Sequence, residues 1–199
     1  MLDEEELNEE NNLVNEAVKI KIVILGKALV GKSALTYRFI SDKFLTDHDT
    51  TIEDQYKTRV TVNGTECDLE VLDTAGQDDY QSMLDSWIDF GNCYLLVYSI
   101  DDLESFKLIK SKYDRICELK KKENFSAVIV GNKRDLPDDQ RKITKTEADY
   151  LAKSLGVECL EVSALTNVNV REAFMLVVSN YLKKNKNISD KWKLGCPCF

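Results

Sequence analysis

The chain has 199 residues, of which 43% are hydrophobic and 31% charged, a balance that suits one folded domain with a sizeable core and flanking tails. Its formal net charge is −8, and positions 1–17 hold seven acidic residues with no lysine or arginine, so the remainder is nearly neutral. This distribution argues against a basic nucleic-acid-binding surface, and we expect no nucleic-acid partner.

The first segment of the chain predicts a solvated tail. Residues 1–18 are acidic and polar, which is typical of a disordered extension. They do not form the basic and then apolar pattern of a signal peptide, and no apolar run is long enough to cross a bilayer. We therefore expect the protein to be made and kept in the cytosol. Four cysteines stand singly in apolar stretches and are expected to be free core thiols: Cys67, Cys93, Cys117 and Cys159.

A phosphate-binding loop follows the first predicted strand. Residues 26–33, GKALVGKS, fit the pattern G-x-x-x-x-G-K-[ST] between an apolar strand at 20–25 and a helix at 34–40. Such matches also arise by chance, but these flanks are the ones that the motif requires. Backbone N–H groups of the loop and of the helix start would form a cradle for phosphate oxygens. Lys32 would reach the β- and γ-phosphates, and the Ser33 hydroxyl would bind Mg²⁺.

The middle of the chain predicts alternating strands and helices. A polar loop at 42–54 precedes two alternating segments, 56–62 and 67–72, which the turn Asn63-Gly64 would join as an antiparallel hairpin. Continuous apolar runs predict parallel strands at 94–100 and 127–130, with a shorter candidate at 159–162. Helical periodicity is found over residues 103–119, 145–155 and 170–182. This order predicts a doubly wound α/β sheet, in which ligands bind at the carboxyl ends of the strands.

A second polar motif, DTAGQ at 73–77, follows the second hairpin strand. Asp73 is suited to hold Mg²⁺ through a water molecule, and Gly76 permits close backbone approach to a γ-phosphate. Gln77 carries donors and an acceptor, which suits it to orient an attacking water. Taken alone, the same segment fits a strand-to-loop turn closed by an Asx bond equally well.

A third motif, NKRD at 132–135, follows the strand predicted at 127–130. The Asp135 carboxylate matches the N1–H and N2–H₂ donors of guanine, and adenine lacks this donor pair. A polar turn would have the same composition, so the motif gains its weight from following the other two in order. Residues 161–164, EVSA, end the last predicted strand and could offer backbone N–H groups to the guanine O6.

This ordered set, together with DTTIED at 49–54, resembles the Ras-like small GTPases over residues 19–184, and TIED resembles the effector segment of the Ras branch. The resemblance implies a small G domain, a phosphate-loop NTPase fold with a six-stranded, mostly parallel sheet, one antiparallel edge strand and helices on both faces. It implies a monomeric switch that cycles between GTP and GDP with Mg²⁺ and hydrolyses GTP slowly. Its expected partners are effectors, an exchange factor and a GTPase-activating protein.

The resemblance also assigns site residues. Nucleotide binding falls to Ala28, Leu29, Val30, Gly31, Lys32, Ser33, Ala34, Phe44, Thr51, Gly76, Asn132, Lys133, Asp135, Ser163, Ala164 and Leu165, with Phe44 stacking on the base. The metal ligands are Ser33, Thr51 and, through water, Asp73, and the catalytic residues are Gln77 and Lys32. The effector segment comprises His48, Asp49, Thr50, Thr51, Ile52, Glu53, Asp54, Gln55 and Tyr56, and a second switch runs from 76 to 89.

The chain departs from Ras at four of these positions. Ala28 and Leu29 stand where Ras has glycines, and the methyl group of Ala28 would crowd Gln77 and an incoming arginine finger. His48 replaces an aromatic residue, and Leu165 replaces a lysine. These departures leave a second hypothesis, a hydrolysis-deficient and mainly GTP-bound interaction module, which the intact glutamine opposes. An ATP-dependent kinase would share the phosphate loop but not the guanine motif.

Residues 185–199 form a lysine-containing tail that ends in Cys196-Pro197-Cys198-Phe199, similar to a C-a-a-X box. The terminal Phe favours geranylgeranylation of Cys196, whereas Pro197 and Cys198 match the aliphatic positions poorly, so an unmodified tail remains the alternative. Attraction to an anionic leaflet would come from Lys183, Lys184, Lys186, Lys191 and Lys193. We therefore expect a lipidated protein at the cytoplasmic face of a membrane, the plasma membrane in particular.

Overall fold

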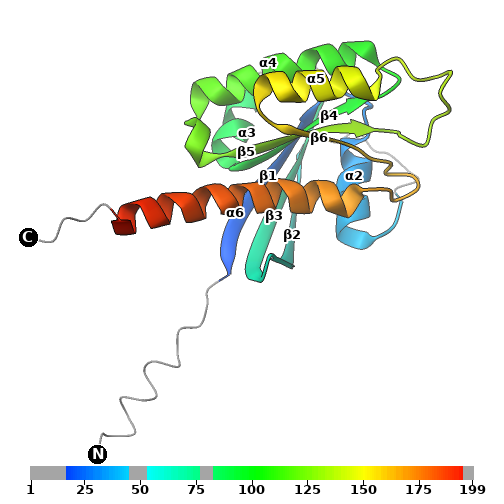
Figure 1. Ribbon diagram of the computed structural model, residues 1–199. Helices are drawn as coiled ribbons and strands as arrows, with labels where there is room; N and C mark the ends of the chain where they lie inside the picture. Colours follow the sequence, from blue (N-terminus) through cyan, green and yellow to red (C-terminus); the bar gives the residue numbers. More distant parts are fainter. Residues whose placement is uncertain (1–16, 45–52, 77–82, 195–199) are drawn as a thin grey trace, which may run out of the picture.

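A six-stranded sheet forms the centre of the molecule (Figure 1). The computed structural model describes residues 17–44, 53–76 and 83–194. The strand order is β2-β3-β1-β4-β5-β6; only the β2–β3 pair is antiparallel, as the hairpin predicted, and the other four pairs are parallel. The strand bounds are β1 Val18–Gly26, β2 Glu53–Val62, β3 Thr65–Thr74, β4 Cys93–Ser99, β5 Ser126–Asn132 and β6 Glu158–Glu161.

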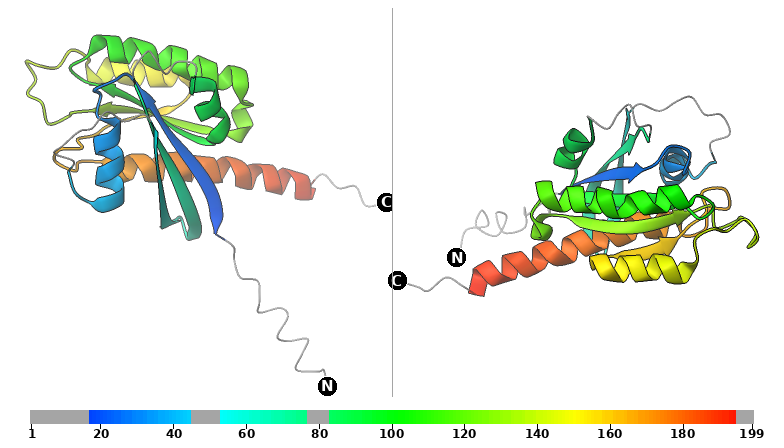
Figure 2. Two further views of the ribbon diagram at one scale, coloured as in Figure 1. Left: turned by 180° about the vertical axis from the view of Figure 1, so that it is seen from behind. Right: turned by 90° about the horizontal axis from the view of Figure 1, so that it is seen from above.

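Helices cover both faces of the sheet (Figures 1 and 2). Alternation along β1 shows why, because Ile20, Ile22 and Ile24 belong to one hydrophobic core, whereas Val23 and Leu25 belong to the other. The first core includes side chains of α2 (Lys32–Ser41) and α6 (Val170–Leu194), and the second those of α3 (Leu84–Phe90), α4 (Leu103–Leu119) and α5 (Lys145–Leu155). A short 3₁₀ turn, η3 (Lys122–Asn124), precedes β5. The doubly wound architecture that the sequence predicted is therefore confirmed.

Several boundaries differ from the sequence-based expectation. Strand β2 begins at Glu53 rather than at 56, because its first residues pair with the end of β3 in the register Glu53↔Thr74 and Asp54↔Asp73. Helix α3 occupies part of the predicted second switch, and α6 continues through Leu194, beyond the helix end predicted at 182. The predictions for His48, Asp49, Thr50, Thr51, Ile52, Gln77 and Cys196 lie outside the described residues.

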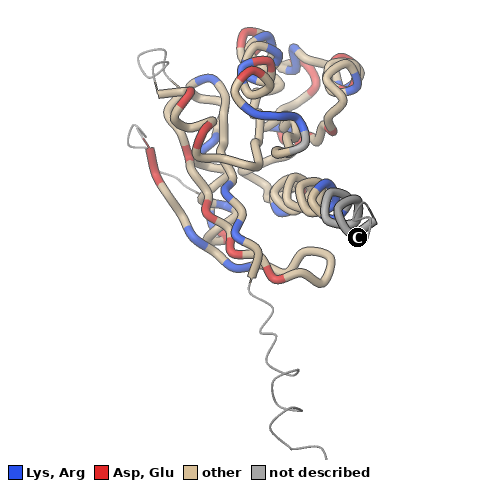
Figure 3. The backbone as a smooth tube through the Cα atoms, turned by 90° about the vertical axis from the view of Figure 1, so that its left-hand side faces the viewer, with Lys and Arg blue, Asp and Glu red and all other residues tan. Residues whose placement is uncertain are grey.

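The burial of the cysteines and the distribution of charge agree with most of what the composition predicted. Cys67 and Cys93 are buried and Cys159 is half-buried, but Cys117 is exposed on α4 and is not the core thiol that its apolar neighbours suggested. Lysines and arginines are interspersed with acidic residues over the described backbone, in keeping with a nearly neutral composition outside the first segment (Figure 3). None of the helices in the described part of the chain has the length and apolarity needed to cross a bilayer.

The start of α5 provides a test of the fold. Thr144 and Glu147 form a capping box, in which the threonine hydroxyl accepts from the Glu147 N–H at 3.2 Å and the Glu147 carboxylate accepts from the Thr144 N–H at 2.8 Å. Thr144→Ala should lower the free energy of unfolding by about 1 kcal/mol, and Thr144→Ser should restore most of it. Thermal unfolding should show a fall in Tm of roughly 2–4 °C for the alanine variant only. Equal Tm values for all three proteins would contradict the capping role.

Candidate nucleotide-binding site

The carboxyl ends of the parallel strands bring the sequence motifs to one edge of the sheet. The phosphate loop follows β1, Asp73 stands near the end of β3, and Asn132 ends β5. The register of the parallel pairs aligns these ends, with Ile24 opposite Asp73 and Ser99 opposite Asn132. This is the edge at which open α/β sheets bind ligands, so the motifs lie where their chemistry requires.

The phosphate loop turns through two left-handed backbone positions. Leu29 has φ 66° and Gly31 has φ 90°. A Cβ at Gly31 would lie 2.4 Å from Nδ2 of Asn132, so a glycine is needed there for space as well as for conformation. Leu29 adopts the left-handed conformation without being a glycine, and no neighbour crowds it, because the residue is 92% exposed. Left-handed turns of this kind aim successive N–H groups into one concavity, which is the geometry of an anion site.

Lys32 lies beneath this loop, buried, with its ammonium group close to the backbone. Its Nζ donates to the carbonyl oxygens of Gly26 at 3.3 Å and Lys27 at 3.1 Å. Burial lowers the pKa of Lys32 to about 8, against the opposing charge of Asp73. Negative phosphate oxygens at this position would favour the ammonium form, so the surroundings of Lys32 fit an anionic ligand.

Asp73 and Gly76 approach the same loop from β3. The Asp73 carboxyl is fully buried at the strand end, and Ser33 lies half-buried at the start of α2. Carboxylate and hydroxyl oxygens are hard ligands of the type that Mg²⁺ takes. The Gly76 carbonyl accepts from the Ala28 N–H at 2.8 Å, and a Cβ at Gly76 would lie 2.5 Å from Lys32 Nζ. Only a glycine can therefore make this contact between the start of the second switch and the phosphate loop.

Asn132 joins the phosphate loop to the last motif. Its side chain is buried; Nδ2 donates to the carbonyl oxygen of Val30 at 2.8 Å, and Oδ1 accepts from the Ala164 N–H at 3.2 Å. Three segments that are far apart in the sequence are thus fixed by one amide.

A cavity of about 250 Å³ opens beside Asn132. Its lining combines apolar side chains with one carboxylate, and includes Leu29, Gly31, Ala34, Phe44, Asn132, Lys133, Asp135, Ala164 and Leu165. The Asp135 carboxylate accepts from the Ser163 hydroxyl at 2.5 Å, and this hydrogen bond fixes the orientation of the carboxylate relative to the motif at residues 161–164. Phe44 lies with its ring centroid 5.7 Å from the guanidinium of Arg38. Apolar walls with a single oriented acceptor suit a flat heterocycle that carries N–H donors on one edge.

The described part of the effector segment is tied to α3. Glu53, Asp54 and Gln55 belong to β2 and pair with the end of β3. The Trp87 indole N–H donates to the Glu53 carboxylate at 2.7 Å, and Trp87 is buried. Tyr56 is half-buried, and burial raises the pKa of its phenol. The two switch regions are therefore in contact through Glu53.

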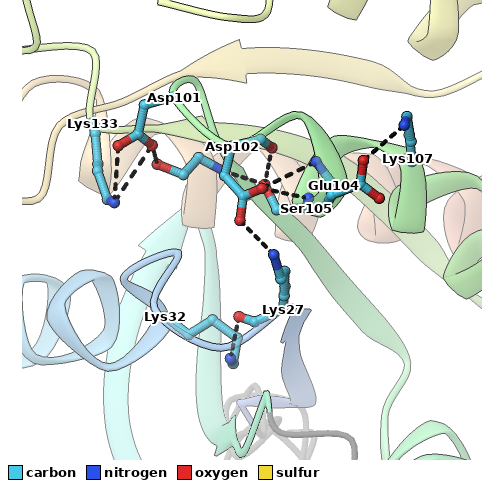
Figure 4. A network of polar contacts seen from close by, with 9 residues as sticks. Lys27, Lys32, Asp101, Asp102, Glu104, Ser105, Lys107 and Lys133 are labelled. Atoms are coloured by element: carbon cyan, nitrogen blue, oxygen red, sulfur yellow. Dashed lines mark hydrogen bonds and ion pairs between the residues drawn. The ribbon is translucent and has the colours of Figure 1, made fainter. Parts of the chain in front are cut away.

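Three residues at this site, Arg38, Asp101 and Asp102, make contacts that were not predicted from the sequence. Arg38 on α2 donates to the carbonyl oxygens of Ala164 at 2.9 Å and Leu165 at 2.8 Å. After β4, Asp101 pairs with Lys133 at 3.5 Å and Asp102 pairs with Lys27 at 2.9 Å (Figure 4). The two acids directly follow an apolar strand, which is the same signal that identified Asp73, and it could have identified them too. No sequence pattern marked Arg38.

Comparison with known proteins identifies the class. The model of the Ras family matches residues 21–183 of this chain. The Ras-like protein rasC of Dictyostelium discoideum is 41% identical over 168 residues, which cover 84% of this chain and 89% of that protein. The Ras-like protein rasS of the same organism is 40% identical over 167 residues, 84% of this chain and 86% of that protein.

The fold and the strand-end motifs are those of a small G domain, and the chain belongs to the Ras family. It is accordingly a Ras-like small GTPase. Membership of this family implies guanine-nucleotide binding and GTPase activity, usually with Mg²⁺.

Asn132 offers a direct test of how the site is assembled. Asn132→Ala removes two buried hydrogen bonds and leaves the Val30 carbonyl and the Ala164 N–H without this partner. The free energy of unfolding should fall by about 2–4 kcal/mol, measured by urea denaturation of the nucleotide-free chain. The matched control is Asn167→Gly, which removes the 2.8 Å bond from an exposed amide to Asp42 and keeps the left-handed backbone at this position (φ 60°), and it should change stability by less than about 0.5 kcal/mol. Similar losses for both variants would contradict the central role of Asn132.

Proposed function

We propose that the chain is a signalling switch that cycles between GTP- and GDP-bound forms, binds effectors when GTP is bound, and hydrolyses GTP slowly. The observation that supports this most is the double hydrogen bond of Asn132, because it brings the phosphate loop and the two base motifs into one continuous site. A switch of this type works when the γ-phosphate orders loops that a partner recognises and hydrolysis releases them.

In the proposed complex, the base occupies the cavity beside Asn132. Asp135, oriented by Ser163, accepts the two guanine N–H donors, and the Ala164 backbone faces O6. Phe44 and Leu165 supply apolar contact on either side of the ring. Adenine presents an acceptor where guanine presents N1–H, so its binding would leave the carboxylate without a donor, which accounts for the proposed selectivity.

The phosphates would lie over the phosphate loop. Backbone N–H groups of residues 29–34 would donate to them, and Lys32 would contribute the balancing charge. Ser33, Thr51 and, through water, Asp73 would hold Mg²⁺, which when bound neutralises charge on the β- and γ-oxygens. Gln77 would orient the attacking water, while Lys32 and the loop N–H groups stabilise the charge that develops on the transferred group.

The proposed partners act at the two switch segments. Effectors would bind the first switch, residues 48–56, and Glu53 is already held by Trp87 of α3 at 2.7 Å. Ordering or disordering of the second switch would therefore be transmitted to Glu53 in the effector-binding segment through the Trp87 indole. An exchange factor and an activating protein would regulate nucleotide release and hydrolysis.

We also propose that the G domain spans residues 19–184, with an acidic N-terminal extension and a tail that is lipidated at Cys196. The lipid and the upstream lysines would hold a monomeric protein at the cytoplasmic face of the plasma membrane. Neither element alone gives stable anchoring, since one chain binds a bilayer only marginally.

Base selectivity is tested by Asp135→Asn. The variant should lose GDP affinity by roughly tenfold or more and gain affinity for xanthosine diphosphate, whose O2 accepts where guanine donates. Both affinities are measured by competition against a fluorescent guanine nucleotide. Asp139→Asn, an exposed carboxylate on the same loop, is the matched control and should behave as the wild type. An Asp135 variant that kept its GDP affinity and gained none for the xanthine nucleotide would refute the assignment.

One contact favours a second candidate function, a mainly GTP-bound module with little hydrolysis. Ala28 donates its N–H to the carbonyl oxygen of Gly76 at 2.8 Å, at the start of the second switch. We therefore expect the Ala28 methyl group to lie close to the groups that hydrolysis needs, where an arginine finger would have to pass it.

Ala28→Gly separates the two candidates. Activating proteins contribute up to roughly 10⁵-fold to hydrolysis through such a finger. We predict that the glycine variant gains more in stimulated than in intrinsic hydrolysis, because the methyl group obstructs a side chain more than it obstructs water. Single-turnover rates with and without a Ras-type activating protein give both numbers. Full stimulation of the wild type with no gain in the variant would show that Ala28 is accommodated, and would remove the support for the module.

A further inference from the structure

Lys27, inside the phosphate loop, forms an ion pair with the first turn of α4. Its Nζ lies 2.9 Å from Oδ2 of Asp102, and the two side chains are 39% and 32% exposed (Figure 4). The loop pattern G-x-x-x-x-G-K-[ST] leaves position 27 open, so no role for this lysine follows from the motif. Partial burial of both partners means that solvent and salt screen this pair less than a fully exposed one.

The carboxylate of Asp102 is held in place by hydrogen bonds that do not involve Lys27. Asp102 is the N-cap of α4, and its Oδ1 accepts from the backbone N–H groups of Glu104 at 3.0 Å and Ser105 at 3.3 Å. Partial burial alone would raise the pKa of Asp102, but the hydrogen bonds from Lys27 and from the capping N–H groups outweigh it, so the pKa lies below its usual value. Because one partner is already ordered, the pair loses less side-chain entropy than most surface ion pairs do.

The backbone carbonyl of Lys27 connects the ion pair with Asp102 to the side chain of Lys32. Its carbonyl oxygen accepts from Nζ of Lys32 at 3.1 Å. One residue is therefore held by α4 through its side chain and supports the phosphate-binding ammonium through its carbonyl. Displacement of Lys27 would displace the nearer of the two carbonyl acceptors that hold the Lys32 ammonium group.

Asp101, the residue before Asp102, connects the same turn after β4 to the guanine motif at residues 132–135. Asp101 lies 3.5 Å from Nζ of Lys133, and the Asp102 N–H donates to the Ser99 carbonyl at 3.0 Å, which closes the turn. Consecutive acids after β4 thus contact the phosphate loop on one side and the guanine motif on the other (Figure 4).

We propose that Lys27 is a positioning residue for the bound nucleotide: its ion pair with Asp102 holds the phosphate loop against α4 and slows nucleotide release. The inference rests on the proposed function, because it concerns how the same site retains a guanine nucleotide. Lys27 itself is not assigned a contact with the nucleotide, and it acts through its carbonyl and Lys32.

The test measures nucleotide release from the full chain. The protein is loaded with a fluorescent GDP analogue and Mg²⁺, and release is followed after addition of excess GDP. Lys27→Met keeps the length of the side chain without the charge, and Asp102→Ser keeps a capping residue without the carboxylate. Each should speed release about two- to fivefold. The double variant should be no faster than either single one, because both remove the same interaction.

Two controls separate positioning from a general loss of stability. Lys27→Arg keeps the charge and should restore slow release. Lys107→Met removes a comparable 2.7 Å ion pair with Glu104 on α4 and should leave release unchanged. The ³¹P resonance of the β-phosphate of bound GDP should shift in the Lys27→Met and Asp102→Ser variants and keep its wild-type position in the Lys27→Arg and Lys107→Met variants. A residue that only stabilised the fold would change Tm and leave that resonance in place.

The outcomes are distinguishable. A wild type that binds no guanine nucleotide would overturn the proposed function, and this inference with it. A wild type that binds normally, with release and ³¹P shift unaltered in Lys27→Met, would overturn only the inference. The same holds if the effects of the two single variants multiply in the double variant, since they would then be independent.

Discussion

The site depends on one buried amide. Asn132 donates to the phosphate loop at Val30 and accepts from the last base motif at Ala164, and it stands 2.4 Å from where a Cβ of residue 31 would be. An amide is the side-chain group that supplies a donor on one side and an acceptor on the other in this plane. An unpaired backbone group at that depth would be costly, so the loops that follow β1 and β6 are held in one position relative to the end of β5.

Around this amide, the sheet aligns the ends of the strands, and the loops carry the charged and polar side chains of the site. Parallel pairing of β1 with β3 and β4, and of β4 with β5, sets the strand ends level. Burial then lowers the pKa of Lys32, and the nearby charge of Asp73 opposes that shift. The turn after β4 adds a second connection, since Asp102 contacts the phosphate loop and Asp101 contacts Lys133. We infer that nucleotide retention depends on loops that are fixed to each other rather than on single residues.

Much of this arrangement could be predicted from the sequence, because strand periodicity and strand-end motifs depend on local chemistry. The hairpin at Asn63-Gly64, the parallel core strands and the convergence of the motifs are all observed. Helix α3 and the first residues of β2 were not foreseen, since tertiary contacts such as the Trp87–Glu53 bond determine them. The contacts of Arg38 and Lys27 were also missed, because their partners lie 126 and 75 positions away in the chain. A local pattern cannot report pairings over such separations.

The central claim, that these loops form a guanine-nucleotide site, is tested most directly by the nucleotide that the protein carries. The full chain is purified in the presence of Mg²⁺, denatured, and the released nucleotide is identified and quantified by chromatography. We predict that GDP or GTP is released in an amount comparable with that of the protein. An adenine nucleotide in its place, or a folded chain that carries no nucleotide and takes up no GDP when it is supplied, would contradict it.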